Sequence, residues 1–333
     1  MKKSSLIAVV LLVLSGSYMG CHAGIWRVNN QLETDKSQRI FSELSPLNDD
    51  ADVFPGDTIH LEGSPVRYNN FNCSKRLVII GPGYFLTENP ETQARAEEAT
   101  ISSIRFNPGS EGSLVMGVVF DYTSSSGIFV ATNNITIQRC YMRGGVTITD
   151  QTGIRVFQNY MLGEVGGYTS STVYSDVVVR NNLFIGGGFN TQSGSFSICE
   201  NNVFTGNNIT ISAASFRNNI ITNANANVSI TSGSAQNNLA AGGQLGSENG
   251  NMAADANSLF VESGSTDGQY QLAQNSPARG AGFDGVDAGA FGGDSGYRLS
   301  GLPPIPLVYD LRVDDSGNLE TGVGIQIKVK SNP

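Results

Sequence analysis

The sequence is poor in charged and metal-binding residues. Only 15% of its 333 residues are charged, there are two histidines, and no lysine occurs between Lys75 and Lys328. The formal charge of −9 and the isoelectric point near 4.7 argue against nucleic acid as a partner, because nucleic-acid binding requires a basic stripe. Neither CxxC nor HxH spacing occurs. The sequence therefore predicts no metal site, no redox centre and no cofactor.

Long hydrophobic runs are also missing, except near the start of the chain. Two lysines precede an apolar stretch at residues 6–14, which is too short to span a bilayer and is typical of a signal peptide. Residues 1–23 are interpreted as a signal peptide cleaved after Ala23. The alternative is cleavage before Cys21 with lipidation, although Tyr18 fits the lipoprotein pattern poorly. We expect a secreted or cell-surface protein without a transmembrane segment, or alternatively an outer-membrane lipoprotein.

A short pattern occurs six times between residues 134 and 242. Its fixed position is a cysteine in the first copy and an asparagine in the other five, and successive positions lie 19, 23, 20, 17 and 19 residues apart. Apolar residues recur three residues before and two residues after this position. A period near 20 residues indicates a solenoid. The fixed positions are Cys140, Asn159, Asn182, Asn202, Asn219 and Asn238.

Each copy is too short for a helical hairpin. β-branched and aromatic residues alternate before the fixed position, and a polar corner, a second strand and a Gly-rich turn follow. This order of elements, repeated once per rung, predicts an all-β fold, namely a right-handed, single-stranded parallel β-helix. Asparagine suits the corner because it tolerates left-handed backbone angles. Stacked about 4.8 Å apart, its amides can also bond to one another, which predicts an internal asparagine ladder.

Weaker signals extend this organisation to both ends of the chain. Gly117 lies 23 residues before Cys140 and is assigned to the same fixed position. A strand at residues 25–28 and a partly helical stretch at 37–47 predict an N-terminal cap that prevents edge pairing. Residues 84–100 interrupt the rhythm and are predicted to form a loop extruded from a rung.

The rhythm fades after Gly242. A Gly-rich closing segment at residues 259–293 is followed by a proline-rich linker, and residues 307–313 and 323–330 are predicted to form a hairpin that caps or extends a sheet. The expected domains are a signal peptide at 1–23, the β-helix at 24–293, and the linker with its hairpin tail at 294–333.

Three cysteines are left in the expected mature chain, namely Cys73, Cys140 and Cys199. Cys140 and Cys199 lie three rungs apart, roughly 14 Å at the spacing of stacked strands, which is too far for a disulfide. Both occupy inward positions. We therefore predict buried, unpaired thiols that act as small apolar residues.

Several segments together resemble a known superfamily. PGDTIHLEG at 55–63, LVIIGPGYFLTENP at 77–90 and LAQNSPARGAGFDGVDAGAFGG at 272–293, with the repeat, resemble secreted bacterial right-handed β-helix proteins of the pectin-lyase-like superfamily. GLPPIPLVYDLRV at 301–313 resembles the tail of such proteins in Bacteroidetes-type bacteria. The resemblance implies the fold for nearly the whole mature chain. It implies no single activity, because that superfamily mixes lyases, glycosidases and adhesins.

The residues expected of a polygalacturonase-like hydrolase are missing. Such an enzyme needs clustered carboxylates, but no Asp-Asp pair occurs between residues 53 and 313, and the only histidines are His22 and His60. The enzymatic alternative is a polysaccharide lyase, in which an arginine abstracts the proton next to a uronate carboxylate. Ca²⁺ belongs only to this alternative. Its candidate bases are Arg143, Arg155 and Arg180.

Two outward rows are candidates for carbohydrate binding. Two residues before the fixed position, Arg180, Glu200 and Arg217 fall in one column, which is either a surface ion-pair ladder or an arginine face that holds carboxylate-bearing glycans. Tyr141 and Tyr160 share the register after the fixed position and are predicted to stack on each other's faces. Exposed rings that could bind sugars are Tyr84, Phe85, Tyr122, Tyr141, Tyr160, Tyr168 and Tyr174.

The sequence favours a non-catalytic β-helix that binds glycans or is structural, because rung lysines, rung histidines and a carboxylate cluster are missing. The lyase is the alternative. We expect a monomer with polysaccharide as its partner, and the candidate ligand-binding residues are Arg180, Arg217, Tyr141 and Tyr160.

Overall fold

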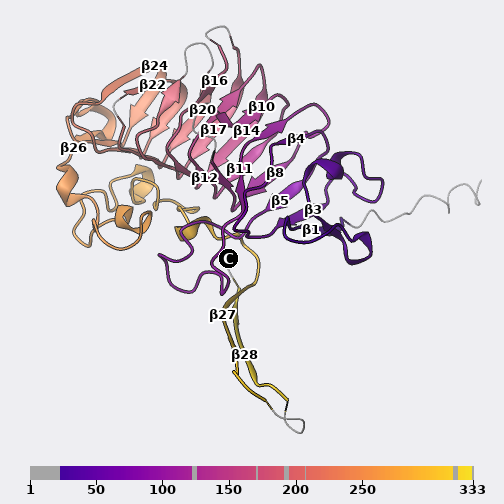
Figure 1. Ribbon diagram of the computed structural model, residues 1–333. Helices are drawn as coiled ribbons and strands as arrows, with labels where there is room; N and C mark the ends of the chain where they lie inside the picture. Colours follow the sequence, from indigo (N-terminus) through magenta and orange to yellow (C-terminus); the bar gives the residue numbers. More distant parts are fainter. Residues whose placement is uncertain are drawn as a thin grey trace, which may run out of the picture.

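The computed structural model describes residues 23–121, 126–169, 172–190, 195–206, 208–317 and 322–331. Residues 1–22 of the predicted signal peptide, including Cys21, lie outside the described residues, as does Tyr122. The described residues form a parallel β-solenoid of about 8 turns with rungs of about 20 residues (Figure 1). This confirms the β-helix fold predicted from the repeat.

A complete rung contains three strands, one more than the repeat predicts. The first strand precedes the corner, a two-residue strand follows the fixed position, and a third strand follows the next turn. The first and third columns are joined in a 17-stranded sheet through the long strands β22 and β24, whereas the two-residue strands form a separate 9-stranded sheet. Every pairing between rungs is parallel among the strands described.

The elements have the following bounds. The first column contains β1 (Ile25–Val28), β3 (Thr58–Leu61), β5 (Val78–Ile80), β8 (Leu114–Met116), β11 (Thr136–Gln138), β14 (Thr152–Phe157), β17 (Ser175–Arg180), β20 (Phe196–Glu200), β22 (Asn208–Arg217) and β24 (Asn227–Gln236). The short-strand sheet contains β6 (Thr100–Ile101), β9 (Val119–Phe120), β12 (Tyr141–Met142), β15 (Tyr160–Met161), β18 (Leu183–Phe184), β21 (Val203–Phe204), β23 (Ile220–Ile221), β25 (Leu239–Ala240) and β26 (Met252–Ala253). The third column contains β4 (Phe71–Cys73), β7 (Ile104–Phe106), β10 (Ser126–Val130), β13 (Gly145–Ile148), β16 (Val165–Gly167) and β19 (Phe189–Asn190), and it continues into the first halves of β22 and β24. Outside the columns lie β2 (Ile40–Phe41), the hairpin strands β27 (Leu307–Val313) and β28 (Ile325–Lys330), and the 3-10 helices η1 (Lys36–Gln38), η2 (Ser45–Asn48), η3 (Glu248–Gly250), η4 (Ala256–Ser258), η5 (Gly268–Tyr270), η6 (Phe283–Gly285) and η7 (Leu299–Gly301).

The residues predicted to point inward form one continuous apolar core. Ile137, three residues before the fixed position, and Met142, two residues after it, are fully buried, as are most of their equivalents on the next rungs. The three cysteines of the described residues are free and buried, as predicted. Burial raises the pKa of the Cys140 thiol to about 12, so this thiol stays protonated near neutral pH.

The asparagine ladder is present and is longer than predicted. Each Nδ2 donates to the Oδ1 of the next rung at 2.9–3.1 Å, and the bonds run in order through Asn159, Asn182, Asn202, Asn219, Asn238 and Asn251. Cys140 joins through its backbone N–H, which donates to Oδ1 of Asn159 at 2.9 Å. Asn251 adds a rung beyond Gly242, where the sequence rhythm fades.

The left-handed backbone angle falls one residue earlier than predicted. Positive φ values occur at the residue just before each ladder position, whereas the ladder asparagines have negative φ. Gly117, with φ of 66°, takes this corner position, and Val118 lies below Cys140 because β9 pairs Val119 with Tyr141. The assignment of Gly117 to the ladder position is therefore wrong by one residue. The other corner residues, with φ of 52–57°, are Arg139, Gln158, Asn181, Asn201, Asn218 and Asn237.

The N-terminal cap and the extruded loop are confirmed. Between β1 and β3, the chain contains two short 3-10 helices, and Leu44 and Leu47, at the start of and within the second one, are buried against the end of the core. The ammonium of Lys75 holds this cap by donating at 2.8–2.9 Å to the backbone carbonyls of Leu47, Asp50 and Val53. Residues 81–99, between β5 and β6, form the loop without regular structure.

The C-terminal part departs from the expected cap or sheet extension. After β26 the chain turns back and runs beside the solenoid towards its N-terminal end, and the hairpin β27–β28 then projects away from it (Figure 1). In the part of the chain that the structure describes, the hairpin strands pair only with each other. The hairpin is thus confirmed, but it neither caps nor extends a sheet of the solenoid.

Replacing Asn202 by alanine tests the ladder. The change removes a buried donor and acceptor, leaves its neighbours Asn182 and Asn219 partly unpaired, and should lower the free energy of unfolding by about 1–3 kcal/mol. Equilibrium denaturation in urea measures the effect. Asn225→Ala, at an exposed position outside the ladder, is the control and should leave stability nearly unchanged. Equal stability of the two variants would contradict a stabilising ladder.

Candidate functional site

The corner residues bind the returning C-terminal segment, and residues 281–302 of that segment are here called the strap. The strap passes the rungs in reverse order and receives at least one hydrogen bond from most of the corners that it crosses. At Asn218 the hydrogen bond runs the other way: its Oδ1 accepts from the backbone N–H of Phe283 at 2.8 Å. The other side chains donate to strap carbonyls at 2.7–3.4 Å: Asn237 to Ala281, Asn201 to Asp287 and Gly289, Asn181 to Ala290 and Gly292, Gln158 to Ser295 and Gly296, and Arg139 to Leu302.

These contacts explain why most of the ladder asparagines occur in Asn-Asn doublets. Four of the ladder asparagines follow another asparagine, as in Asn181-Asn182 and Asn201-Asn202. The first residue of each doublet turns the corner with a positive φ and points its amide at the strap, whereas the second points its amide into the ladder. The doublet is the sequence signal from which a strap along this edge could have been found.

The tyrosine pair lies under the C-terminal segment and does not form an open platform. Tyr141 and Tyr160 pair in adjacent strands with ring centroids 5.3 Å apart, but their planes meet at 85°, so the contact is edge-to-face and not stacked as predicted. Phe85 of the extruded loop packs on both rings. Tyr84 is fully buried, and its hydroxyl bonds to that of Tyr297 at 2.6 Å.

Burial therefore overturns part of the predicted set of exposed rings. Tyr84, Tyr160 and Tyr174 are buried, whereas Tyr168 is exposed. Of the two predicted ligand-binding tyrosines, Tyr160 is covered and Tyr141 is only partly exposed. Tyr84 and Tyr160 are buried because the outward face of the short-strand sheet is apolar and residues 254–299 cover it. Tyr174 instead packs into the solenoid core, with its ring centroid 5.7 Å from that of Phe196.

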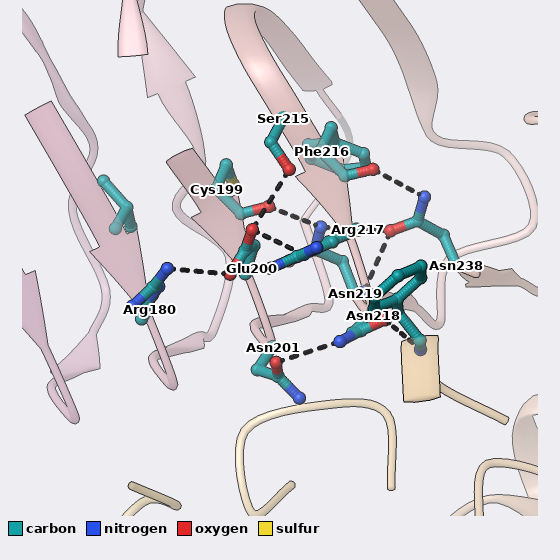
Figure 2. Close-up of polar contacts among 12 residues, drawn as sticks. Arg180, Cys199, Glu200, Asn201, Ser215, Phe216, Arg217, Asn218, Asn219 and Asn238 are labelled. Atoms are coloured by element: carbon teal, nitrogen blue, oxygen red, sulfur yellow. Dashed lines mark hydrogen bonds and ion pairs between the residues drawn. The ribbon is translucent and has the colours of Figure 1, made fainter. Parts of the chain in front are cut away.

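The predicted column of Arg180, Glu200 and Arg217 is confirmed by the strand register (Figure 2). Glu200 lies between the two arginines, at 3.0 Å from Nη2 of Arg180 and 2.6 Å from Nε of Arg217. The Ser215 hydroxyl also donates to Glu200, at 3.1 Å. The Glu200 side chain is only 6% exposed, whereas those of Arg180 and Arg217 are 40% and 33% exposed. The column is thus more than a surface ion-pair ladder, because its carboxylate is buried.

A groove runs between this column and the strap. One part, of about 330 Å³, contains Arg180, Glu200 and Arg217 on one side and the strap residues Phe283, Asp284 and Asp294 on the other. A second part, of about 230 Å³, shares Arg180 and Asp294 with the first and continues past Phe157 to Arg298. Corner residues, among them Asn181, line both parts, so the hydrogen bonds that hold the strap also shape the groove.

Aromatic rings border the groove at two points. The Arg217 guanidinium lies 5.1 Å from the centre of the Phe283 ring, which is 43% exposed. Phe157 occupies the position below Arg180 in the same outward column. Arg139 is buried at the corner of the rung before that of Phe157. Burial and the nearby Arg298 lower the pKa of Arg139 to about 10. The groove therefore combines cations, carboxylates and ring faces.

The other arginines predicted as catalytic bases do not share this groove. Arg143 pairs with Asp121 at 3.0 Å, and Arg155 pairs with Asp176 at 2.9 Å. Arg180 alone among the three predicted bases lies in the groove. Sequence reasoning missed the strap side of the site, Phe283, Asp284, Asp294 and Arg298, because strap and column are far apart in the chain.

A further cleft, of about 360 Å³, lies at the N-terminal end of the outward column that contains Arg180, beside the linker to the hairpin. It contains His60, the only histidine among the residues described, and Glu62. Burial lowers the pKa of His60, which favours the neutral ring. The Glu62 carboxylate is already bound by Arg27 and Asn29. Glu62 is therefore held by structural contacts.

The described residues contain neither a candidate metal site nor a candidate membrane-spanning helix. No group of three or more His, Cys, Asp or Glu side chains is arranged to hold a metal ion. No described helix is long and apolar enough to cross a membrane.

The fold and the groove define the class of this protein: a parallel β-solenoid with a C-terminal strap and an arginine-lined groove along its edge. The chain matches no protein-family model, and searches of curated proteins and of solved structures find no match. The resemblance to the pectin-lyase-like superfamily therefore stays a prediction beyond the level of the fold.

Two substitutions of Asn181 separate the strap contacts from the corner conformation. Asn181→Gly keeps the left-handed corner but leaves the carbonyl of Gly292 unpaired and that of Ala290 with the N–H of Tyr297 alone, which should lower the free energy of unfolding by about 1–3 kcal/mol. Asn181→Ala also forces an alanine into the left-handed conformation, which should lower the free energy of unfolding by about 1 kcal/mol more than the glycine substitution does. Denaturation combined with limited proteolysis of the strap measures both effects. Wild-type stability and proteolysis of the glycine variant would show that the strap is held by other contacts.

Proposed function

We propose that the protein is a non-catalytic β-solenoid that binds an acidic glycan in the groove beside the strap. The observation that carries this proposal is the arginine pair of the groove. Arg180 and Arg217 are half-exposed and share one buried carboxylate, that of Glu200, so the trio keeps an excess positive charge. Guanidinium groups bind carboxylates through charge-assisted and often bidentate hydrogen bonds.

The arginine pair is held in place before a ligand arrives. Both guanidinium groups are fixed by Glu200, which lies on the strand between theirs, and Phe283 packs on that of Arg217. A fixed side chain loses less conformational entropy on binding than a mobile one. Each guanidinium has five N–H donors, so contact with Glu200 leaves donors for a ligand.

The strap side of the groove restricts the class of ligand. Asp284 and Asp294 line it and would accept hydrogen bonds from hydroxyl groups, but they would repel a dense polyanion. Arg180 and Arg217 lie two rungs apart, about 10 Å at the spacing of stacked strands. A sugar chain with spaced carboxylates and many hydroxyls suits this arrangement. Phe157 and Phe283 add ring faces for the apolar faces of the sugars.

The environment of the arginines supports binding over β-elimination. Arg143, Arg155 and Arg180, the candidate bases, are each engaged with a carboxylate. Glu200 is buried and held by three side chains, so it is poorly placed to receive a proton from a substrate. The proposal includes secretion through the predicted signal peptide, which would bring the groove to extracellular polysaccharides.

Single substitutions in the groove test the proposal. Arg180→Gln and Arg217→Gln each leave Glu200 with one arginine and Ser215, and each should weaken binding to a soluble polyuronate by roughly tenfold, the effect of one lost charge-assisted hydrogen bond. Isothermal titration calorimetry against the polyuronate and a neutral glucan measures affinity and selectivity. Binding should also weaken as salt is raised.

Arg155→Gln is the matched control. Arg155 is an ion-paired arginine on the same sheet, 32% exposed, but it lies outside the groove, so its loss should not change polyuronate binding. Unchanged binding by both groove variants, or equal binding of the neutral glucan, would refute the assignment of the groove. Release of unsaturated uronate, followed by its ultraviolet absorbance, would replace the non-catalytic proposal by the lyase alternative.

A further inference from the structure

The C-terminal hairpin has one apolar face and one polar face. β27 and β28 pair antiparallel, and a bulge at Tyr309 shifts the register between Val308 and Asp310. Without this bulge, Val308 and Leu311 would lie on opposite faces of the ribbon, because side chains alternate along a strand. With it, six aliphatic side chains share one face: Val308, Leu311, Val313, Ile325, Ile327 and Val329.

The apolar face is open to solvent. The exposed fractions of its six side chains range from 36% to 63%. Together they expose on the order of 500 Å² of aliphatic surface, near the upper limit of the largest apolar patch on a typical monomer. Val323 lies two residues before β28, and the other large exposed apolar residues in the described ranges are scattered along the chain from Ile25 to Phe283. Among the described residues, the hairpin is therefore the one place where such residues gather in a continuous run.

The opposite face carries charges that pair with one another. Asp310 lies 2.9 Å from the ammonium of Lys328 and 3.2 Å from Nε of Arg312. This side is suited to water, and its paired charges leave little positive charge to attract an anionic membrane surface. The apolar side contains no aromatic residue of the kind that anchors proteins at a membrane interface.

The root of the hairpin is attached to the body of the protein. Leu307 is buried against Leu86 and Leu302, and the carbonyl of Val308 accepts from the N–H of Ala94 at 2.8 Å. Lys330 pairs with Glu91 of the same loop at 3.2 Å. Beyond this root the ribbon projects away from the solenoid (Figure 1). A flat face held clear of the body is accessible to a partner of similar shape.

We propose that the hairpin is a dimerisation element, and that its apolar face packs against the same face of a second copy of this chain. An isolated two-stranded hairpin is marginally stable in water, whereas four strands packed in two layers have an apolar core and two polar outer faces. The face has neither charge nor side-chain hydrogen-bonding groups, so an identical face in twofold symmetry complements it. Two copies would bury roughly 1,000 Å², near the lower limit for a specific interface, which fits a weak dimer.

The oligomeric state of the full-length protein tests this assignment. Sedimentation velocity over a wide concentration range should show a reversible equilibrium between monomer and dimer. Leu311→Glu places a charge at the centre of the apolar face and should raise the dissociation constant by roughly tenfold or more. Gln326→Glu adds the same charge to the polar face of the same ribbon and should leave the equilibrium unchanged.

Cross-linking distinguishes a lost interface from an unfolded hairpin. The described cysteines are buried, so in a Cys21→Ser background an introduced Ile327→Cys is the accessible thiol. Mild oxidation should link two copies through residue 327, whereas Gln326→Cys should stay monomeric. A wild-type protein that is monomeric at all concentrations, with no cross-link through residue 327, would overturn the proposal. Binding of the wild type to phosphatidylcholine vesicles that is lost in Leu311→Glu would also overturn it, in favour of a lipid surface.

Discussion

Each rung in the centre of this solenoid turns its corner through one left-handed residue, and the rest of the structure depends on that turn. The residue that turns must tolerate a positive φ, and the next residue must send an amide into the core. Asparagine meets both demands, because its short side chain tolerates the left-handed region and its amide both donates and accepts. The doublets Asn181-Asn182 and Asn201-Asn202 combine the two solutions in adjacent positions. The corner thus divides its hydrogen bonds between the inside of the solenoid and its edge.

This division links the stability of the fold to the shape of the groove. The ladder satisfies polar groups that the core would otherwise leave unpaired, at 2.9–3.1 Å on successive rungs. The corner amides hold the strap, and the strap forms the wall opposite Arg180 and Arg217. The buried carboxylate of Glu200 then fixes the arginines against this wall. A site of this kind is rigid because each of its sides belongs to the scaffold.

The repeat predicted the rungs, the inward residues, the ladder and the register of the arginine column, because all of these follow from a local period. The one-residue error at Gly117 arose because glycine signals the left-handed corner and not the ladder. The groove could not be predicted, since it needs Arg180 and Asp294 to meet across more than a hundred residues without a repeat between them. Tyr160 was misjudged for the same reason. Its outward direction was correct, but the segment that covers it has no period of its own.

The direction of the strap also sets an order on folding. Rungs contact their neighbours in the chain, so they can form one after another as the chain becomes available. The strap crosses these rungs in reverse, and its last bond joins Arg139 to Leu302, 163 residues further along. Contacts over such separations form late, because the loop between them must first be closed. A chain that ends before residue 254 would leave the corner side chains and the apolar face of the short-strand sheet uncovered. The surface of the solenoid is therefore fully covered only after the strap has been synthesised. Incomplete chains would be the ones that proteases cleave.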